Sequence, residues 1–75
     1  MTKLQEMRQK NNLSQSKLAE LSGVKIRMIQ QYEINARNID GAKLETLCDL
    51  AAALNCKIYD ILENDDLIKK VKKRT

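Results

Sequence analysis

Apolar residues recur three or four positions apart along most of this chain, the spacing that places side chains on one face of an α-helix. In a first segment, from residue 3 to about residue 11, Leu4 and Met7 form such a stripe. The next two stripes consist of Leu18, Ala19 and Leu21, and of Val24, Ile29 and Tyr32. The pattern therefore predicts three short helices in the first half of the chain.

The residues between these stripes favour helix ends and tight turns. Ser14 precedes the second stripe, where its hydroxyl can accept a hydrogen bond from a free amide of the first helical turn. Gly23 follows that stripe, where a reversing chain needs the positive φ that glycine adopts cheaply. Because Ala19 lies four residues before Gly23, its small side chain lets the next helix cross closely. Asn11-Asn12 are expected to end the first helix, and Asn55 marks a further turn.

The second half of the chain carries a loop and two more stripes. Residues 34–41 are expected to form the longest loop, from which Ile39 plugs the core. Asp40 is expected to cap the next helix, about Ala42 to Leu54. The predicted buried positions of that helix are Leu44, Leu47, Cys48, Leu50, Ala51 and Leu54. A short fifth helix is expected to follow, with Ile58, Ile61 and Leu62 as apolar positions and Tyr59 beside them.

Composition favours a single small all-α domain, because the 75 residues include no proline and only two aromatic side chains. No apolar run approaches the length of a membrane span or a secretory signal, so we expect a cytoplasmic protein without membrane contact. Two cysteines without any histidine lack the ligands of a structural zinc site. We interpret Cys48 and Cys56 as buried free thiols, and we expect neither a metal nor another cofactor.

The formal net charge of +4 is unevenly distributed. Residues 1–41 carry seven basic and four acidic side chains, residues 42–66 carry two basic and six acidic ones, and residues 67–75 carry five basic and no acidic ones. A protein that binds a polyanion needs its basic groups on one face. The first segment can supply that face while the acidic segment points away from it.

The two helices within residues 13–33 are joined by a tight turn at Ser22–Gly23. Their characteristic positions are Gln15, Leu18-Ala19, Gly23-Val24, Ile29 and Tyr32-Glu33. This pattern resembles the helix-turn-helix of the phage repressor and Cro family of DNA-binding transcriptional regulators. The flanking chain also matches, with Leu4 and Arg8 before the motif and the segment Leu44–Leu62 after it. The resemblance covers about residues 3 to 63.

The resemblance implies a compact five-helix, repressor-like domain in which the second and third helices form the helix-turn-helix. We assign residues 1–66 to this domain and residues 67–75 to a basic C-terminal tail. In the resembling family an arginine at the place of Arg8 pairs with the glutamate that closes the recognition helix, which here is Glu33. We therefore expect an Arg8–Glu33 ion pair, the alternative being a solvated arginine.

The outward face of the third helix is expected to contact bases. Arg27 can donate two hydrogen bonds to guanine, Gln31 can pair with adenine, and Ile26 can press against a thymine methyl group. Phosphate or marginal contacts are expected from Gln15, Ser16, Lys25, Met28, Gln30 and Arg37. Two positions depart from the family pattern: Lys25 stands where a Ser or Thr usually caps the helix, and Asn35 replaces the usual glycine after it.

A homodimer is expected, because fifth helices of the resembling family often make the two-fold contact. The candidate dimer residues are Ile58, Tyr59, Ile61 and Leu62, for which closing the core is the alternative role. Beyond them, Leu67, Ile68 and Val71 lie at helical spacing among basic residues. That segment either extends the dimer surface or forms a flexible basic arm.

The leading hypothesis is a sequence-specific regulator of transcription, a repressor that binds double-stranded DNA as a dimer. The alternative is a protein-interaction module, such as an antitoxin-like subunit. An enzyme is not expected, since the chain has no histidine, no cysteine with a base and no glycine-rich phosphate loop. A small-molecule substrate is not expected either.

Overall fold

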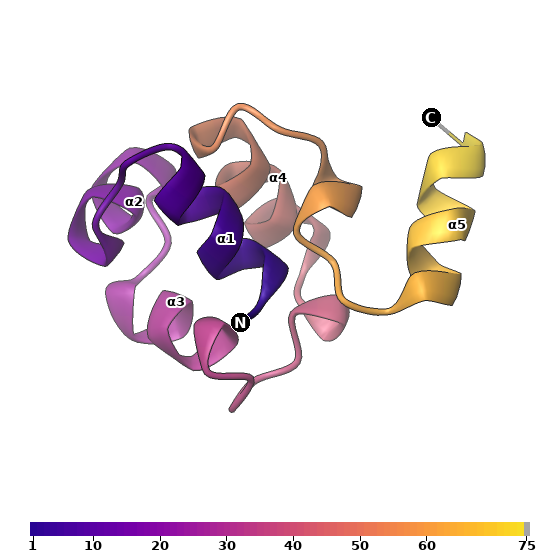
Figure 1. The fold of residues 1–75 in the computed structure, drawn as a ribbon, viewed down its shortest axis with the longest axis horizontal. Helices are drawn as coiled ribbons and strands as arrows, with labels where there is room; N and C mark the ends of the chain where they lie inside the picture. Colours follow the sequence, from indigo (N-terminus) through magenta and orange to yellow (C-terminus); the bar gives the residue numbers. More distant parts are fainter. Residues whose placement is uncertain (75) are drawn as a thin grey trace.

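The computed structural model describes residues 1–74, and of Arg74 it describes the backbone alone. These residues form five α-helices and two 3-10 turns (Figure 1). In chain order they are α1 (Lys3–Lys10), α2 (Gln15–Ser22), α3 (Ile26–Glu33), η1 (Ile39–Gly41), α4 (Leu44–Ala53), η2 (Ile58–Asp60) and α5 (Asp65–Arg74). The all-α prediction is confirmed. Among residues 1–74, no helix is long and apolar enough to cross a membrane.

The helix ends use the residues that the sequence singled out. The Ser14 hydroxyl accepts a hydrogen bond from the backbone amide three residues on, at 3.0 Å, and so caps α2. Gly23 ends α2 with a φ of 77°, in the left-handed region. Asn12, Asn35 and Asn55 also have positive φ, of 58°, 60° and 53°. Asparagine tolerates this conformation better than most residues, so the usual glycine after α3 is dispensable here.

One apolar core joins all the helices. α2 packs against both α3 and α4, while α1 packs against α3 and η2. The buried cluster consists of Leu4, Leu18, Val24, Ile29, Tyr32, Ile39, Leu47, Leu50, Leu54, Ile61, Leu62 and Ile68. Ile39 reaches this cluster from the loop after α3, as expected.

Three positions expected in the core are exposed. Leu21 is 52% exposed, because it lies about 110° around α2 from the buried side, which is centred between Leu18 and Ala19. Leu44 is 69% exposed, because it is the first residue of α4 and lies beyond the edge of the core. Cys48 is exposed as well, since it follows the buried Leu47 and points about 100° away from it.

Cys56 differs from the expectation in a smaller way, because its side chain is half-buried. Burial, reinforced by the negative charge of Asp60, raises the pKa of the Cys56 thiol from 9.0 to about 11. The interpretation of both cysteines as buried thiols is therefore wrong for Cys48 and holds only in part for Cys56.

The predicted fifth helix is also misplaced. Only a 3-10 turn, η2, forms at the expected position, and the fifth α-helix lies farther on, at α5. Ile68 of α5 is only 8% exposed, and Leu67 and Val71 pack against the core. Residues 67–74 are therefore a docked helix rather than a flexible arm, and the expected boundary after residue 66 falls inside α5. Thr75, the last residue of the expected tail, lies outside the described residues.

The Asp40 carboxylate holds the start of this last segment. Its Oδ1 atom accepts hydrogen bonds from the backbone amides of Glu63 and Asn64, at 2.8 and 3.1 Å. The expectation that Asp40 caps α4 is thus wrong, since the residue before α4 is Lys43 and no side chain caps that helix. Asp40 instead ties the loop after α3 to the segment that leads into α5.

Candidate nucleic-acid interface

Helix α3 has one buried and one open face. Ile29 and Tyr32 are buried in the core, while Arg27 and Gln30 on the other side are exposed. Two further predicted contact residues, Ile26 and Gln31, lie on the same open side, with Ile26 38% exposed and Gln31 half-buried. The structure therefore brings the three predicted base-contacting side chains together on one side of a single short helix.

A buried ion pair fixes the far end of this helix to α1. The Arg8 Nε atom donates to Glu33 Oε2 at 2.7 Å, and the Nη2 atom of Arg8 donates to Glu33 Oε1 at 3.1 Å. The remaining terminal nitrogen donates to the Leu13 carbonyl at 2.7 Å. Because the Glu33 side chain is only 1% exposed and that of Arg8 12%, both charges depend on this geometry for their solvation. The predicted Arg8–Glu33 pair is confirmed, and it is bidentate.

Gln15 adds the first residue of α2 to the same cluster. Its Nε2 atom donates to Glu33 Oε1 at 3.0 Å, and its Oε1 accepts from Gln30 Nε2 at 3.5 Å. The carboxylate of Glu33 thus joins α1, α2 and α3. Sequence reasoning missed this positioning role of Gln15, because the acceptor lies 18 residues away and no local pattern marks it.

The start of α3 has no side-chain cap. Lys25 precedes the helix with extended backbone angles, φ −59° and ψ 136°, and its side chain is exposed and makes no capping bond. Ser22 does not substitute for it, since its Oγ accepts from the amide of Val24, one residue before Lys25. The departure from the family pattern at Lys25 therefore leaves the first turn of α3 without a capping side chain, as expected.

The other predicted contact residues surround α3. Ser16 is exposed on the first turn of α2, and Arg37 is exposed on the loop after α3. Met28 is half-buried, and with Arg37 it lines a surface hollow of about 380 Å³ between the end of α3 and the start of α4. Lys43 is exposed on the rim of the same hollow, just before α4, whereas the sequence pattern predicted it inside that helix.

The charge around α3 is positive. Between residues 21 and 39, Glu33 is the only acidic residue, and it is buried and paired with Arg8. The three basic residues in this stretch, Lys25, Arg27 and Arg37, are all exposed. A local excess of exposed cations suits a polyanionic partner.

The four predicted dimer residues divide into two pairs. Ile61 and Leu62 are fully buried in the core of the protomer and cannot meet a second copy, so their assignment to a dimer surface is wrong. Ile58 and Tyr59 are half-buried and line a groove between α4, η2 and α5. The ammonium group of Lys72 lies 5.0 Å from the centre of the Tyr59 ring.

A family model described as helix-turn-helix matches residues 4–61 of this chain. No curated protein and no solved structure matches it. The matched range covers α1 to η2, and therefore includes the ion pair, the turn at Gly23 and the open face of α3. The chain accordingly belongs to the phage repressor and Cro type of helix-turn-helix proteins, a family of DNA-binding transcriptional regulators.

Proposed function

We propose that this protein is a sequence-specific repressor of transcription that inserts α3 into the major groove of double-stranded DNA. The observation that carries the proposal is the open face of α3, held in place by the Glu33 carboxylate through Arg8 and Gln15. A helix tied to two others through one carboxylate presents its side chains at a fixed angle. Fixed geometry is what the recognition of hydrogen-bonding patterns on base edges requires.

Three side chains have the chemistry to contact bases. The planar guanidinium of Arg27 can donate two hydrogen bonds to the O6 and N7 atoms of guanine. The amide of Gln31 can pair with N6 and N7 of adenine, and Ile26 can pack against a thymine methyl group. Arg27 and Gln31 are four residues apart, about one helical turn, so both can enter the groove together.

Contacts to the DNA backbone would come from the residues around α3. Gln15 uses one hydrogen of its amide for Glu33, and the second can be donated to a phosphate oxygen. Ser16, Lys25 and Arg37 are exposed on either side of α3 and can bind phosphates on both edges of the groove. Met28 and Gln30 stand at the margin, where contacts with the sugar-phosphate backbone are expected.

The regulator is proposed to act as a homodimer. Of the four candidate dimer residues, Ile58 and Tyr59 are accessible to a second copy. A two-fold dimer on DNA should place its recognition helices about 34 Å apart, one turn of the duplex. Polar substitution at Ile58 should therefore reduce self-association in sedimentation experiments and weaken binding to a two-fold symmetric site.

Selection of binding sites from a random duplex pool tests the proposal. The unmutated protein should enrich one short sequence, present as two related half-sites about one helical turn apart. Enrichment of no sequence would contradict the proposal, and the alternative of a protein-interaction module would then take its place. A single half-site, together with a monomer in sedimentation at high concentration, would contradict the dimer alone.

A further inference from the structure

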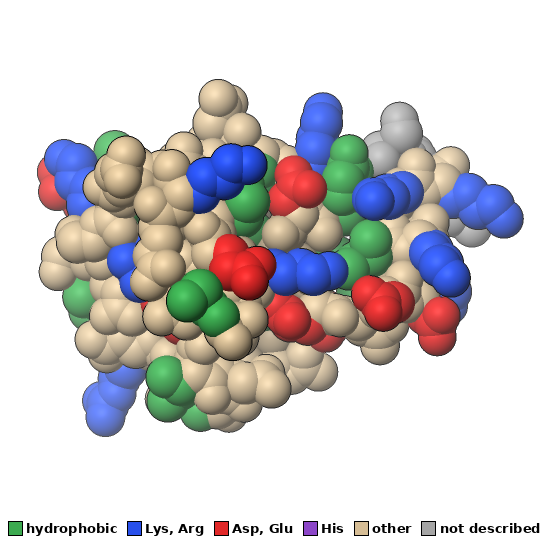
Figure 2. All heavy atoms as spheres, in the orientation of Figure 1, with side chains coloured by type: hydrophobic (Ala, Val, Ile, Leu, Met, Phe, Trp, Pro, Cys, Tyr) green, Lys and Arg blue, Asp and Glu red, His purple; other side chains and the backbone are tan. Residues whose placement is uncertain are grey.

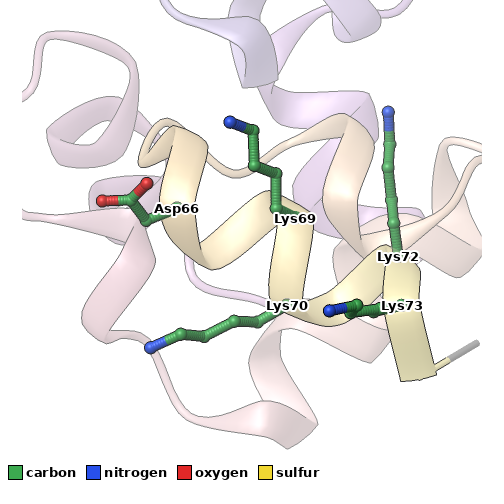
Figure 3. A pocket seen from close by; sticks show the side chains of 5 residues that line it. All are labelled: Asp66, Lys69, Lys70, Lys72 and Lys73. Carbon is green, nitrogen blue, oxygen red and sulfur yellow. The ribbon is translucent and has the colours of Figure 1, made fainter.

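The outward side of α5 carries a concentration of positive charge that plays no part in the proposed interface of α3. Lys69, Lys70, Lys72 and Lys73 are all exposed within ten residues of helix. Figure 2 shows Lys and Arg side chains gathered at the end of the molecule that α5 forms. In Figure 3 their ammonium groups point in different directions, with Lys69 and Lys72 on one side of the helix and Lys70 on the other. Together with Asp66, the four lysines line a surface hollow of about 710 Å³. Because their ammonium groups diverge, they form a charged strip rather than a site for one small anion.

The fold does not neutralise this strip. Within residues 1–74, the ion pairs join Arg8 to Glu33 and Lys17 to Glu20, and none involves a lysine of α5. Asp65 and Asp66 occupy the first turn of α5, where negative charge is favourable because of the helix dipole. Lys72 lies over the Tyr59 ring. Lys69, Lys70 and Lys73 are left as solvent-exposed cations without an acidic partner among the described side chains.

The apolar side of α5 is already occupied. Ile68 is 8% exposed and belongs to the core, and Leu67 and Val71 pack against it. An amphipathic helix that binds a membrane must bury its apolar face among the lipids. Because α5 uses that face for the fold, only its charged side is open to a partner, which favours an extended polyanion over a lipid surface.

The start of α5 is close to the loop that follows α3. The Asp40 carboxylate accepts two hydrogen bonds from Glu63 and Asn64 just before α5, and it lies three residues after Arg37. In Figure 1 α5 forms one end of the molecule and runs across its longest axis, along which the whole molecule measures 32 Å. The whole molecule, α3 and α5 included, therefore spans about nine base pairs at ~3.4 Å each. The strip thus begins beside a proposed phosphate contact and reaches away from α3.

We propose that Lys69, Lys70 and Lys73 bind backbone phosphates of the same duplex, outside the stretch that α3 contacts. The inference rests on the proposed DNA binding by α3, and it assigns to α5 the role of adding affinity without adding sequence preference. Each phosphate that a lysine neutralises releases condensed counterions and steepens the log–log dependence of affinity on salt by about 0.9. Three such contacts steepen it by about 2.7.

A triple variant with K69Q, K70Q and K73Q tests this assignment on a duplex taken from the random-pool selection. The slope of its log affinity against log salt concentration should be less steep by about two to three. Its affinity at 50 mM salt should fall by at least about tenfold, while its base preferences should stay unchanged. The matched triple Lys→Arg variant keeps the charge and should keep the steep salt dependence. K10Q, which removes an exposed lysine in the last turn of α1, should match the unmutated protein. Circular dichroism should show the same helix content in all four proteins.

Ethylation interference on that duplex shows which phosphates are involved. Ethylated phosphates outside the α3 footprint should block binding of the unmutated protein and have no effect on the Lys→Gln triple variant. Equal salt dependence and equal footprints for these two proteins would overturn the assignment to α5 while leaving α3 as the base-contacting helix. Binding to phosphatidylserine vesicles that the Lys→Gln variant loses, with an unchanged DNA footprint, would likewise overturn it in favour of a lipid surface. If the unmutated protein selects no sequence, the proposed function itself fails.

Discussion

The two halves of this small domain are held together by different kinds of contact. In residues 1–38, one buried carboxylate, that of Glu33, accepts hydrogen bonds from Arg8 and Gln15 and so fixes three helices at one point. In residues 39–74, α5 is attached mainly by aliphatic side chains, with Ile68 at the centre of the contact. Hydrogen bonds to a buried charge are directional, whereas aliphatic contacts tolerate small shifts. The orientation of the helices is therefore specified most strongly next to the proposed recognition helix.

The largest effect is expected from Glu33→Ala in the first half. This change leaves the mostly buried Arg8 without its carboxylate, which typically costs about 3–5 kcal/mol of unfolding free energy. Denaturant titration measures it. In a double-mutant cycle with Arg8→Met, the coupling should be at least about 0.5 kcal/mol, above that of many exposed pairs. A coupling of zero would show that the ion pair does not hold α1 to α3.

A smaller and more local effect is expected from Ile68→Ala in the second half. The truncation should weaken the docking of α5 by about 2–4 kcal/mol, the usual cost of shortening a buried isoleucine. Hydrogen exchange should then rise in α5 while the amides of α1 to α3 stay protected. A uniform rise along the whole chain would contradict the difference between the halves, because it would show that they unfold as one unit.

The two helices of the motif offer a contrast within the first half. Ser14→Ala should destabilise the protein by about 1 kcal/mol, because it removes the cap of α2. Lys25→Ser should stabilise it by about 0.5–1 kcal/mol, since α3 has no side-chain cap and the backbone there is already extended. Ser16→Ala, at an exposed position, is the matched control and should stay within about 0.5 kcal/mol. Thermal melts would refute the capping argument if Lys25→Ser were as destabilising as Ser14→Ala.

The smallest expected effect is a difference in reactivity between the two cysteine thiols, which does not involve the stability of the fold. The pKa of the Cys56 thiol is raised to about 11, so only about a thousandth of it is thiolate at pH 8. Iodoacetamide should modify the exposed Cys48 first, and the rate at Cys56 should rise about tenfold per pH unit up to pH ~11. Mass spectrometry of the digested protein follows both sites. Equal rates at pH 8 would contradict the half-buried placement of Cys56.

Local chemistry made the first half predictable from the sequence. A hydroxyl before an apolar stripe indicated the cap at Ser14, and glycine at the reversal indicated the positive φ of Gly23. The Arg8–Glu33 pair followed from the resemblance rather than from spacing, since 25 residues separate the partners. The hydrogen bond from Gln15 to Glu33 was not predicted, because it joins residues that are far apart in the sequence.

The second half was predicted less well, because equal apolar spacing can belong to different structures. Ile58, Ile61 and Leu62 lie at helical spacing, yet the chain there forms a 3-10 turn. Residues 67–74 of the segment interpreted as a tail belong to the fifth α-helix, and the start of that helix carries an overlooked signal. The Oδ1 atom of Asn64 accepts from the Leu67 amide at 3.0 Å, and two acidic residues follow Asn64. An asparagine followed by acidic and then basic residues is a typical beginning of a helix.

Along α3, spacing alone identified the open face, because a helix has only one side to turn away from Ile29 and Tyr32. Spacing fails where an element ends. Leu44 has the same period as the buried residues of α4 but stands at its first position, outside the core. Whether a periodic residue is buried depends on what lies opposite it, and that information is tertiary.

In the proposed interface, Arg27 and Gln31 select bases while Arg37 binds the DNA backbone. Site selection from a random duplex pool with Arg27→Ala and Arg37→Ala, each titrated over a range of salt, tests it most directly. Arg27→Ala should cost about 1–3 kcal/mol on the preferred site and relax the choice of base at one position. Arg37→Ala should weaken all sequences alike and lower the salt slope by about one. If Arg27→Ala keeps the original base preferences and only weakens binding uniformly, the assignment of α3 as the base-contacting helix is contradicted.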